Sequence, residues 1–419
     1  MRLGVFALLL ALGCDTSLSP EPPIPDPNRV HLGLLQAFGG PGGFDGFFAE
    51  KEARLALQEI NAAGGVNGQE LDLLLAATER GDPDPTAITR ASANELADLG
   101  VVAVAGPPTS SDVLGMADLA VSRRLPIISS FATAAAISEL NDDDFVWRML
   151  PSDEFQGRVL ADRIHRDGID TVSILHTNTP YGVGLARTLR AAFEQAGGRV
   201  LAQVSFPEAK TTDFGGEVAA AFAQGDPPAI VLIASAFETA GISTALLERN
   251  PMPRPALYGG DASRDNALLG NAPPEIITGM RGTLPTAPRD NPSTLAHDMA
   301  YRSVLGEEPQ RSLLPVYDTV YLIALALLQG GENTHEAVRA HLREVSRPDS
   351  SAPVSVGVGT EEFLKAARNV GGDLDFEGAS GGIDFDAHGD VTRITYEIWE
   401  VVSGPEGLAF VRIEEVTLR

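Results

Sequence analysis

The feature that most constrains the fold of this chain is an alternation of short apolar runs with longer helical patterns. The run VVAVAG (101–106) has almost no polar character, so both faces of the strand must be buried, as in a parallel sheet covered by helices. Residues 46–62 repeat apolar side chains at helical spacing and stop before Gly64-Gly65, a typical C-terminal signal. The alternation predicts an α/β fold built on parallel sheets.

Two series of this kind follow each other, and 419 residues suffice for two to three domains. We therefore expect two doubly wound lobes. The predicted first lobe comprises residues 30–149 plus 262–388, and the second comprises 150–261 plus 389–419. The chain would cross between them near 149–152, 258–263 and 385–391, which gives a three-strand hinge.

The N-terminus carries a targeting pattern. Arg2 precedes ten apolar residues, and residues 1–13 are typical of a signal peptide rather than a spanning helix. Ala11-Leu12-Gly13-Cys14 resembles the lipobox of bacterial lipoproteins, so we expect cleavage before Cys14 and lipidation of that residue. The alternative is an ordinary secretory signal that happens to contain cysteine. Residues 14–29 hold five prolines and are expected to form an extended tether.

Composition excludes several functions. The 57 acidic residues outnumber the 31 basic ones, and the formal charge of −26 opposes binding to nucleic acid or anionic lipid. The single cysteine cannot form an internal disulfide or a zinc cluster. Known hydrolase, nucleotide-binding and zinc-protease motifs are absent from the sequence, which argues against an enzyme, and we expect no cofactor or metal. The acidic residues in IDFDAHGD (383–390) favour a β-turn over a calcium loop.

A series of loop and turn sequences runs along almost the whole body of the chain: INAAGGVNGQELDL (60–73), GDPDPTAITRASANELAD (81–98), GPPTSS (106–111), ISSFATA (128–134), HTNTPYGVGLARTL (176–189), YGGDA (258–262) and FEGASGGIDFDAHGD (376–390). Together they resemble the periplasmic leucine/isoleucine/valine-binding protein family, the type I solute-binding proteins of ABC importers. The resemblance implies the two-lobed fold predicted above, with a ligand between the lobes.

One part of the candidate site follows from local chemistry. Ser110 and Ser111 come after the strand that ends at Gly106 and begin a helix, where free N–H groups and the helix dipole favour an anion. The alternative is that both serines only cap the helix. The resemblance favours a ligand carboxylate at Ser110 and implies a second donor, Thr133, after the next strand.

The remaining contacts are implied by the resemblance alone. The carbonyl of Phe131 and the carboxylate of Asp261 would hold the ligand's ammonium, and Tyr181 would pack against the ligand from the other lobe. Phe237 would line the side-chain pocket. Phe131 is bulkier than the family's residue, and Asp45, if it points inward, would add a second negative charge. Asp261 otherwise reads as a solvated turn residue.

The sequence thus predicts an extracytoplasmic solute-binding lipoprotein, in the periplasm or on the outer face of the cytoplasmic membrane. We expect a monomer that captures a small amino acid, of the branched-chain or aliphatic class, or a related amide. Hinge closure would precede delivery to an ABC permease. Two alternatives remain open: a ligand-sensing receptor of the same fold, and an envelope scaffold that activates a cell-wall enzyme.

Overall fold

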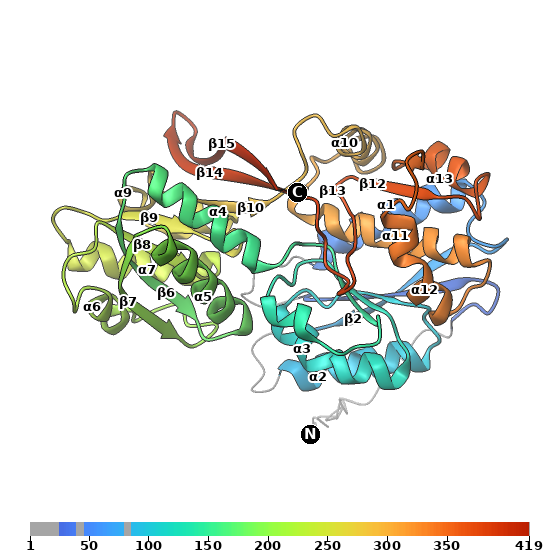
Figure 1. The fold of residues 1–419 in the computed structure, drawn as a ribbon, viewed down its shortest axis with the longest axis horizontal. Helices are drawn as coiled ribbons and strands as arrows, with labels where there is room; N and C mark the ends of the chain where they lie inside the picture. The colour runs from blue at the N-terminus through green and yellow to red at the C-terminus, as the bar shows by residue number, and fades with distance from the viewer. Residues whose placement is uncertain (1–24, 39–45, 79–84, 419) are drawn as a thin grey trace, which may run out of the picture.

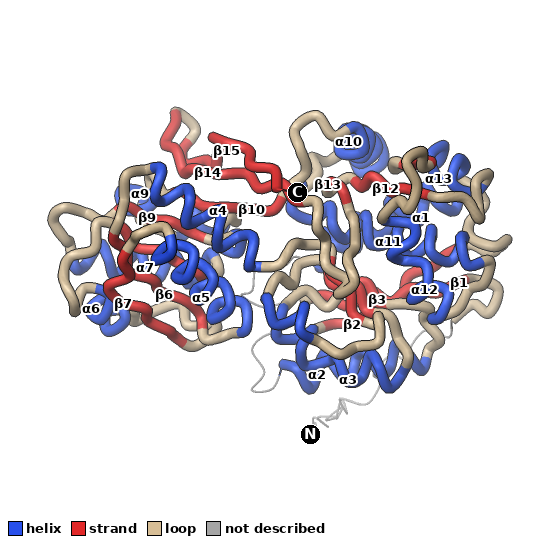
Figure 2. The backbone as a smooth tube through the Cα atoms, in the orientation of Figure 1, coloured by secondary structure: helices blue, strands red, loops and turns tan. Residues whose placement is uncertain are grey.

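The structure is a computed structural model that describes residues 25–38, 46–78 and 85–418. Two large sheets, each with helices on both faces, form two lobes that lie side by side in Figure 1. Figure 2 shows strands at the centre of each lobe and helices around them. The predicted α/β fold of two doubly wound, parallel-sheet lobes is confirmed. The predicted signal peptide, Cys14 and Asp45 lie outside the described residues.

The first lobe is built on a five-stranded parallel sheet in the order β2-β1-β3-β4-β5. Its strands are β1 (Val30–Gln36), β2 (Leu71–Ala77), β3 (Val104–Ala105), β4 (Ile127–Ser129) and β5 (Val146–Arg148). One face packs on α1 (Gly46–Ala62), α11 (Leu314–Gly330) and α12 (His335–Ser346), and the other on α2 (Pro85–Asp98) and α3 (Ser110–Arg123). Both faces are therefore buried, as the apolar run at 101–106 requires.

The second lobe is built on a seven-stranded sheet in the order β15-β14-β10-β9-β8-β6-β7. Its parallel strands are β6 (Thr171–Thr177), β7 (Arg199–Phe206), β8 (Ala229–Ile233), β9 (Ala256–Gly259) and β10 (Arg281–Pro285), and the antiparallel edge is β14 (Ile394–Gly404) and β15 (Gly407–Leu418). Helices α4 (Asp153–Arg166) and α5 (Pro180–Gln195) cover one face, and α6 (Gly215–Ala221) and α7 (Ala236–Arg249) cover the other.

Shorter elements complete the two lobes. Three of them lie near the second sheet: η2 (Asp261–Ser263), α8 (Asn266–Asn271) and α9 (Pro274–Ile277). The others belong to the first lobe: η1 (Ala135–Glu139), α10 (Pro292–Leu305), η3 (Arg311–Leu313), β11 (Val354–Val356), α13 (Thr360–Ala367), β12 (Leu374–Gly378) and β13 (Gly381–Gly382). Strands β11, β12 and β13 form a small third sheet. Within the described residues, one segment, Arg311–Gly330, is long and apolar enough to cross a membrane. It contains α11, which is buried along most of its length in the core of the first lobe.

The predicted lobe boundary at residue 261 is wrong. Strand β10 pairs with β9 and β14, so residues 262–285 belong to the second lobe. The second crossing comes after Pro285 and before α10, whose Tyr301 lies in the core of the first lobe. The third crossing lies between Val391, which packs in that core, and the start of β14. A five-residue strand that pairs at long range carries no periodic signal of its own, so local sequence could not assign it.

A buried ion pair ties the first and third crossing segments together. Arg148, at the end of β5, donates from Nε and Nη2 to the two carboxylate oxygens of Asp390 at 2.6 and 2.7 Å. The arginine side chain is fully buried, and it also donates to the carbonyl of Ala134 and the hydroxyl of Ser138. This bidentate contact fixes the geometry of two of the three connecting segments.

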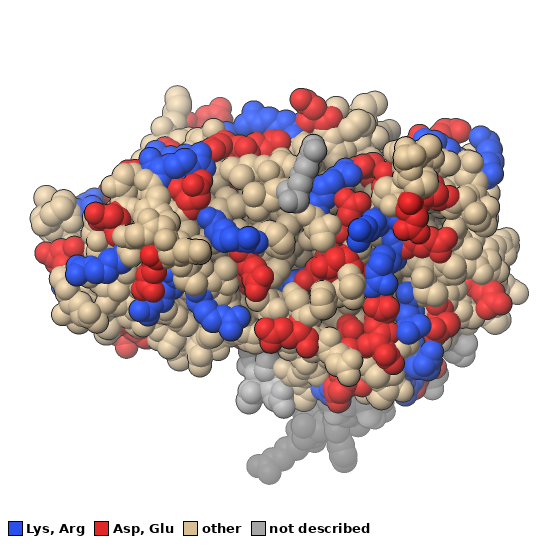
Figure 3. Space-filling model, viewed as in Figure 1, with Lys and Arg blue, Asp and Glu red and all other residues tan. Residues whose placement is uncertain are grey.

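Acidic and basic side chains are intermixed on the face drawn in Figure 3. Charged side chains also form ion pairs between helices, such as Arg123 with Asp98 and Arg124 with Glu336. The negative charge of the chain is therefore distributed and partly paired.

Candidate functional site

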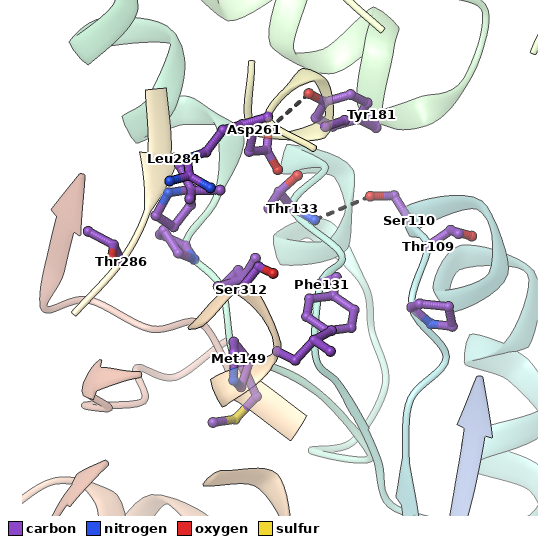
Figure 4. Close-up of a pocket in the computed structure, with 18 of the residues that line it drawn as sticks. Thr109, Ser110, Phe131, Thr133, Met149, Tyr181, Asp261, Leu284, Thr286 and Ser312 are labelled. Carbon is purple, nitrogen blue, oxygen red and sulfur yellow. Dashed lines mark hydrogen bonds between the residues drawn. The ribbon is translucent and has the colours of Figure 1, made fainter. Parts of the chain in front are cut away.

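A cavity of about 700 Å³ lies between the two lobes. Its walls come from the loops after β3, β4 and β5 of the first lobe and after β6, β8 and β9 of the second. Open α/β sheets carry ligands at this edge, outside the carboxyl ends of their strands. The sequence-predicted ligand residues that line this one cavity are Ser110, Ser111, Phe131, Thr133, Tyr181, Phe237 and Asp261. Figure 4 shows several of them from both lobes.

Three helices begin at the cavity, and a hydroxyl residue caps each of them. Thr109 accepts from the Asp112 N–H at the start of α3, and Thr179 accepts from the Gly182 N–H at the start of α5. Ser235 forms a capping box with Glu238 at the start of α7. The free N–H groups and positive dipole ends of these helices make this part of the cavity favourable for an anion.

Ser110 and Ser111 are not the caps of α3, because Thr109 takes that role and the serines occupy the first two helical positions. The Ser110 hydroxyl oxygen accepts from the backbone N–H groups of Thr133 at 3.3 Å and Ala134 at 3.1 Å. The oxygen is thereby fixed at the meeting point of the β3 and β4 loops. Its hydroxyl hydrogen remains available to donate to an anion in the cavity.

Asp261 and Tyr181, both in the second lobe, are joined by a hydrogen bond. The Tyr181 hydroxyl and the Gln156 Nε2 both donate to Asp261 Oδ1 at 2.9 Å. Burial raises the pKa of Asp261, while these two hydrogen bonds act in the opposite direction. Burial and the charge of Asp261 hold the pKa of Tyr181 well above its usual value, so the phenol stays a donor. Asp261 is thus a carboxylate positioned through Oδ1 by two side-chain donors.

A second carboxyl group, Asp153, lies close to this cluster and was not predicted. It is fully buried at the first residue of α4, where its backbone N–H donates to the Thr133 carbonyl at 2.8 Å. Burial, and then the charge of Asp261, raise the pKa of Asp153 well above its ordinary value. Asp153 and Gln156 are three residues apart on one face of α4, directly after the first crossing, but such a polar pair on a helix does not by itself indicate contact with Asp261.

The apolar part of the cavity includes Phe131, Phe237, Met149 and Leu284. Phe131 is half-buried and packs against the core of the first lobe, so its ring forms a wall on the side of β4. Figure 4 shows this ring below Thr133, near Met149. The cavity therefore combines a polar end with an apolar wall, the usual composition of a small-molecule site.

Sequence reasoning missed the loop between α10 and α11. Gln310, Arg311, Ser312 and Leu313 also line the cavity. They include the short η3 turn, which has neither helical nor strand periodicity. No local signal in the sequence identifies such a segment as part of a site.

The acidic turn at 383–390 has the predicted β-turn geometry. Asp386 Oδ1 accepts from the N–H groups of His388 and Asp390, and Phe385 forms an antiparallel bridge with Val391. The Asp390 carboxylate is occupied by Arg148. Across the part of the chain that the structure describes, no group of three or more His, Cys, Asp or Glu side chains could hold a metal ion.

Comparison with known proteins supports the same architecture. The family model described as "Periplasmic binding protein" matches residues 29–367. The leucine-, isoleucine-, valine-, threonine- and alanine-binding protein of Pseudomonas aeruginosa is 24% identical over 382 residues, which are 89% of this chain and 90% of the relative.

Two solved structures have the same fold. The leucine-binding protein LivK of Thermotoga maritima has a TM-score of 0.74 and 21% identity, and the match covers 93% of this chain and 99% of that one. LivJ of Streptococcus pneumoniae, a branched-chain amino acid transporter substrate-binding protein solved with isoleucine, has a TM-score of 0.72 and 22% identity. That match covers 92% of this chain and 99% of LivJ.

Proposed function

Because the chain belongs to the periplasmic binding protein family, in its type I Leu/Ile/Val-binding branch, we propose that it captures a small α-amino acid for an ABC importer. Members of this family are solute-binding proteins rather than enzymes. The observation that carries the proposal is that residues from both lobes, in the positions expected for an amino-acid ligand, line a single cavity.

The α-carboxylate of the ligand would bind at the first lobe. The N-terminus of α3 supplies free backbone N–H groups, and the hydroxyls of Ser110 and Thr133 add donors. Such an arrangement stabilises an anion through positioned hydrogen bonds and a helix dipole. A fixed serine oxygen also loses little entropy when a ligand arrives.

The α-ammonium would bind between the Phe131 carbonyl and the Asp261 carboxylate. Tyr181 and Gln156 hold one carboxylate oxygen of Asp261, so the other can face the cation without a large rearrangement. Tyr181 and Phe237 would cover the ligand from the second lobe. Branched-chain and aliphatic amino acids are the first candidates, because the relatives named above are described as binding them.

Binding would close the molecule. A ligand that bridges Ser110 and Thr133 on one lobe to Tyr181 and Asp261 on the other has more contacts in the closed state, so it shifts the population toward closure. The crossing segments at 149–152, 286–291 and 392–393 would bend, with the Arg148–Asp390 pair as a fixed point on the side of the first lobe.

Family members are periplasmic, and we propose in addition that Cys14 carries a lipid and that the closed form docks on a permease. A lipid anchor would keep the binding protein close to its permease and raise its local concentration there.

A ligand screen tests the function directly. Purified protein is exposed to the twenty amino acids and to a panel of amides and aromatic acids in a thermal-shift assay, and hits are measured by calorimetry and X-ray scattering. A ligand at 100 times its Kd stabilises by ~2.7 kcal/mol, a shift of a few degrees. We expect such a shift together with a smaller radius of gyration. A shift without compaction would refute hinge closure. If amino acids, amides and aromatic acids all fail to bind, the transport proposal is wrong and the scaffold alternative is favoured.

A further inference from the structure

The cavity has a wall of mixed apolar and polar residues near the hinge that the proposed amino-acid contacts leave unused. This hinge wall consists of lining residues from the three crossing segments, the β12–β13 turn and the loop before α11: Met149–Pro151, Leu284–Ala287, Gln310–Leu313, Pro315, Ser380, Gly382, Ile383, Val391 and Arg393–Thr395. Of the residues labelled in Figure 4, Met149, Leu284, Thr286 and Ser312 belong to it.

Charge is divided unevenly around the cavity. Its acidic lining residues all lie on the lobes: Asp112, Glu208, Glu238, Asp261 and Asp265. The basic lining residues are Arg264, which pairs with Glu397 in the second lobe, and Arg311 and Arg393 of the hinge wall. An amphoteric ligand in this field is oriented with its cation toward Asp261, and any further anion is drawn to the hinge wall.

Arg311 is the better positioned of the two arginines of the hinge wall. Its Nη2 donates to Asp298 Oδ2 at 2.6 Å, and Asp298 is itself buried beside His297 on α10. The Arg311 side chain is 49% exposed. Among the described residues its Nε and Nη1 have no hydrogen-bond partner, so the guanidinium is anchored at one nitrogen and open at two. Arg393, by contrast, pairs with Glu377 and approaches Asp384.

Neighbouring hydrogen-bonding groups extend this surface. Gln310 and Ser312 are both exposed and flank Arg311. In the view of Figure 4, the Ser312 and Phe131 side chains both lie away from Tyr181. This part of the cavity lining therefore offers a hydroxyl, an amide and a guanidinium to a ligand side chain. An aliphatic side chain would desolvate these groups without replacing their hydrogen bonds.

We propose that the hinge wall is a subsite for an anionic group at the end of the ligand's side chain, with Arg311 as the residue that recognises it. The inference rests on the proposed function and replaces its first candidates, the aliphatic amino acids, with α-amino acids that carry a second carboxylate, such as glutamate. Guanidinium recognises a carboxylate through two parallel hydrogen bonds, which an amide or an alkyl group cannot reproduce.

Calorimetry with L-glutamate, L-glutamine and L-leucine tests the subsite. We expect glutamate to bind more tightly than the other two, and Arg311→Gln to weaken glutamate binding by roughly tenfold to a hundredfold, the range for a lost charge-assisted hydrogen bond. Leucine and glutamine affinities should change less than about threefold in the variant. Arg311→Lys keeps the charge but loses the fork, and it should give an intermediate loss for glutamate.

Arg302 supplies a matched control. It is 47% exposed, also approaches Asp298, and does not line the cavity. Arg302→Gln removes the same charge from the same neighbourhood and should leave glutamate affinity unchanged. An equal loss of glutamate affinity in both variants would show that the effect comes from the long-range field of the positive charges, and it would overturn the assignment of Arg311.

The two proposals fail in distinguishable ways. Leucine binding without glutamate binding in the unaltered protein refutes the anionic subsite and leaves the proposed function intact. No binding of any amino acid refutes the proposed function itself. A third outcome is that Arg311→Gln and Arg311→Lys leave glutamate affinity and the melting temperature unchanged. That result would show that the glutamate side chain binds elsewhere, and it too would refute the subsite.

Discussion

Replacing Asp261 by Asn tests the proposed ammonium site most directly. The substitution keeps size and removes one negative charge. In the structure, Asp261 Oδ1 accepts from Tyr181 and Gln156, each at 2.9 Å, and an asparagine oxygen can keep both hydrogen bonds. The amide nitrogen would then take the place of Oδ2 and face the ligand cation. The variant therefore changes the electrostatics of the site with little change in its shape.

The expected magnitude follows from the environment of the carboxylate. Truncating one side of a buried, hydrogen-bonded charge pair costs about 2–5 kcal/mol in binding. Asp261 still borders an open cavity in this structure, and solvent screens it partly, so we expect the lower part of that range. About 2–3 kcal/mol corresponds to a ~30- to 150-fold rise in Kd. Burial raises the pKa of Asp261, so affinity in the unaltered protein should also fall as the pH approaches that pKa, and the variant should lack this dependence.

Calorimetry with the best ligand from the amino-acid screen provides the measurement, and Asp265→Asn provides the control. Asp265 lines the same cavity and caps α8 by accepting from the Ala267 N–H, a role that Asn fills equally well. Its substitution removes the same charge and should change Kd less than about threefold. If Asp261→Asn leaves Kd unchanged, the ligand has no cation at this site and the assignment is refuted. Equal losses of affinity in both variants would indicate only the long-range electrostatic effect of removing one negative charge.

Three further predictions concern the hinge, a buried carboxyl group and the anchor. Asp390→Asn leaves the buried Arg148 charge uncompensated and should lower the free energy of unfolding, measured in urea, by about 3–5 kcal/mol. As a control, Glu194→Gln removes one partner of the exposed pair with Arg190 and should change this free energy by less than ~0.5 kcal/mol. Losses of similar size in both variants would refute the role of burial. Burial raises the pKa of Asp318 from 3.8 to about 6, so the folded protein binds this proton more tightly than the unfolded chain and loses on the order of 3 kcal/mol of stability as the pH rises from 4 to 6. Asp318→Asn should flatten that part of the pH–stability curve, and an unchanged slope would contradict the assignment. Cys14→Ala should abolish membrane association or processing. In the unaltered protein, the intact mass should show an added lipid and the loss of residues 1–13. A soluble mature chain with a free thiol would refute lipidation.

Much of the fold was predictable because it depends on local patterns. The helices at 46–62 and 110–123 begin and end where apolar periodicity, cap residues and glycine signals indicate. Strands without polar side chains had to be buried on both faces, and that requirement alone selects a parallel sheet between two helix layers. Ser110 could be named as a candidate contact because it follows a predicted strand and begins a helix, at the edge of the sheet where ligands bind. Thr133 and Tyr181 were named only through the family resemblance, and the structure shows that all three residues line one cavity.

The neighbours that tune those contacts could not be predicted in the same way. Gln156 reaches Asp261 from a helix 105 residues earlier in the chain, and the charge of Asp261 in turn helps to raise the pKa of Asp153. Their effect on pKa depends on burial and on distance in space, neither of which appears in a local pattern. The same reason applies to Arg311, whose loop has no periodicity and reaches the cavity only because α10 and α11 are packed on the first lobe.

The sequence by itself therefore determined the fold class, the two-lobed organisation and the strand ends at which a ligand would sit, because backbone hydrogen bonding and apolar burial act through short-range periodicity. Only the tertiary structure decided that β10 joins the second sheet, so that residues 262–285 lie in the second lobe. It also decided which charges share the cavity. Strand partners and electrostatic neighbours are chosen among segments distant in sequence, by the packing of the whole molecule, and a short apolar or irregular segment does not specify its partner.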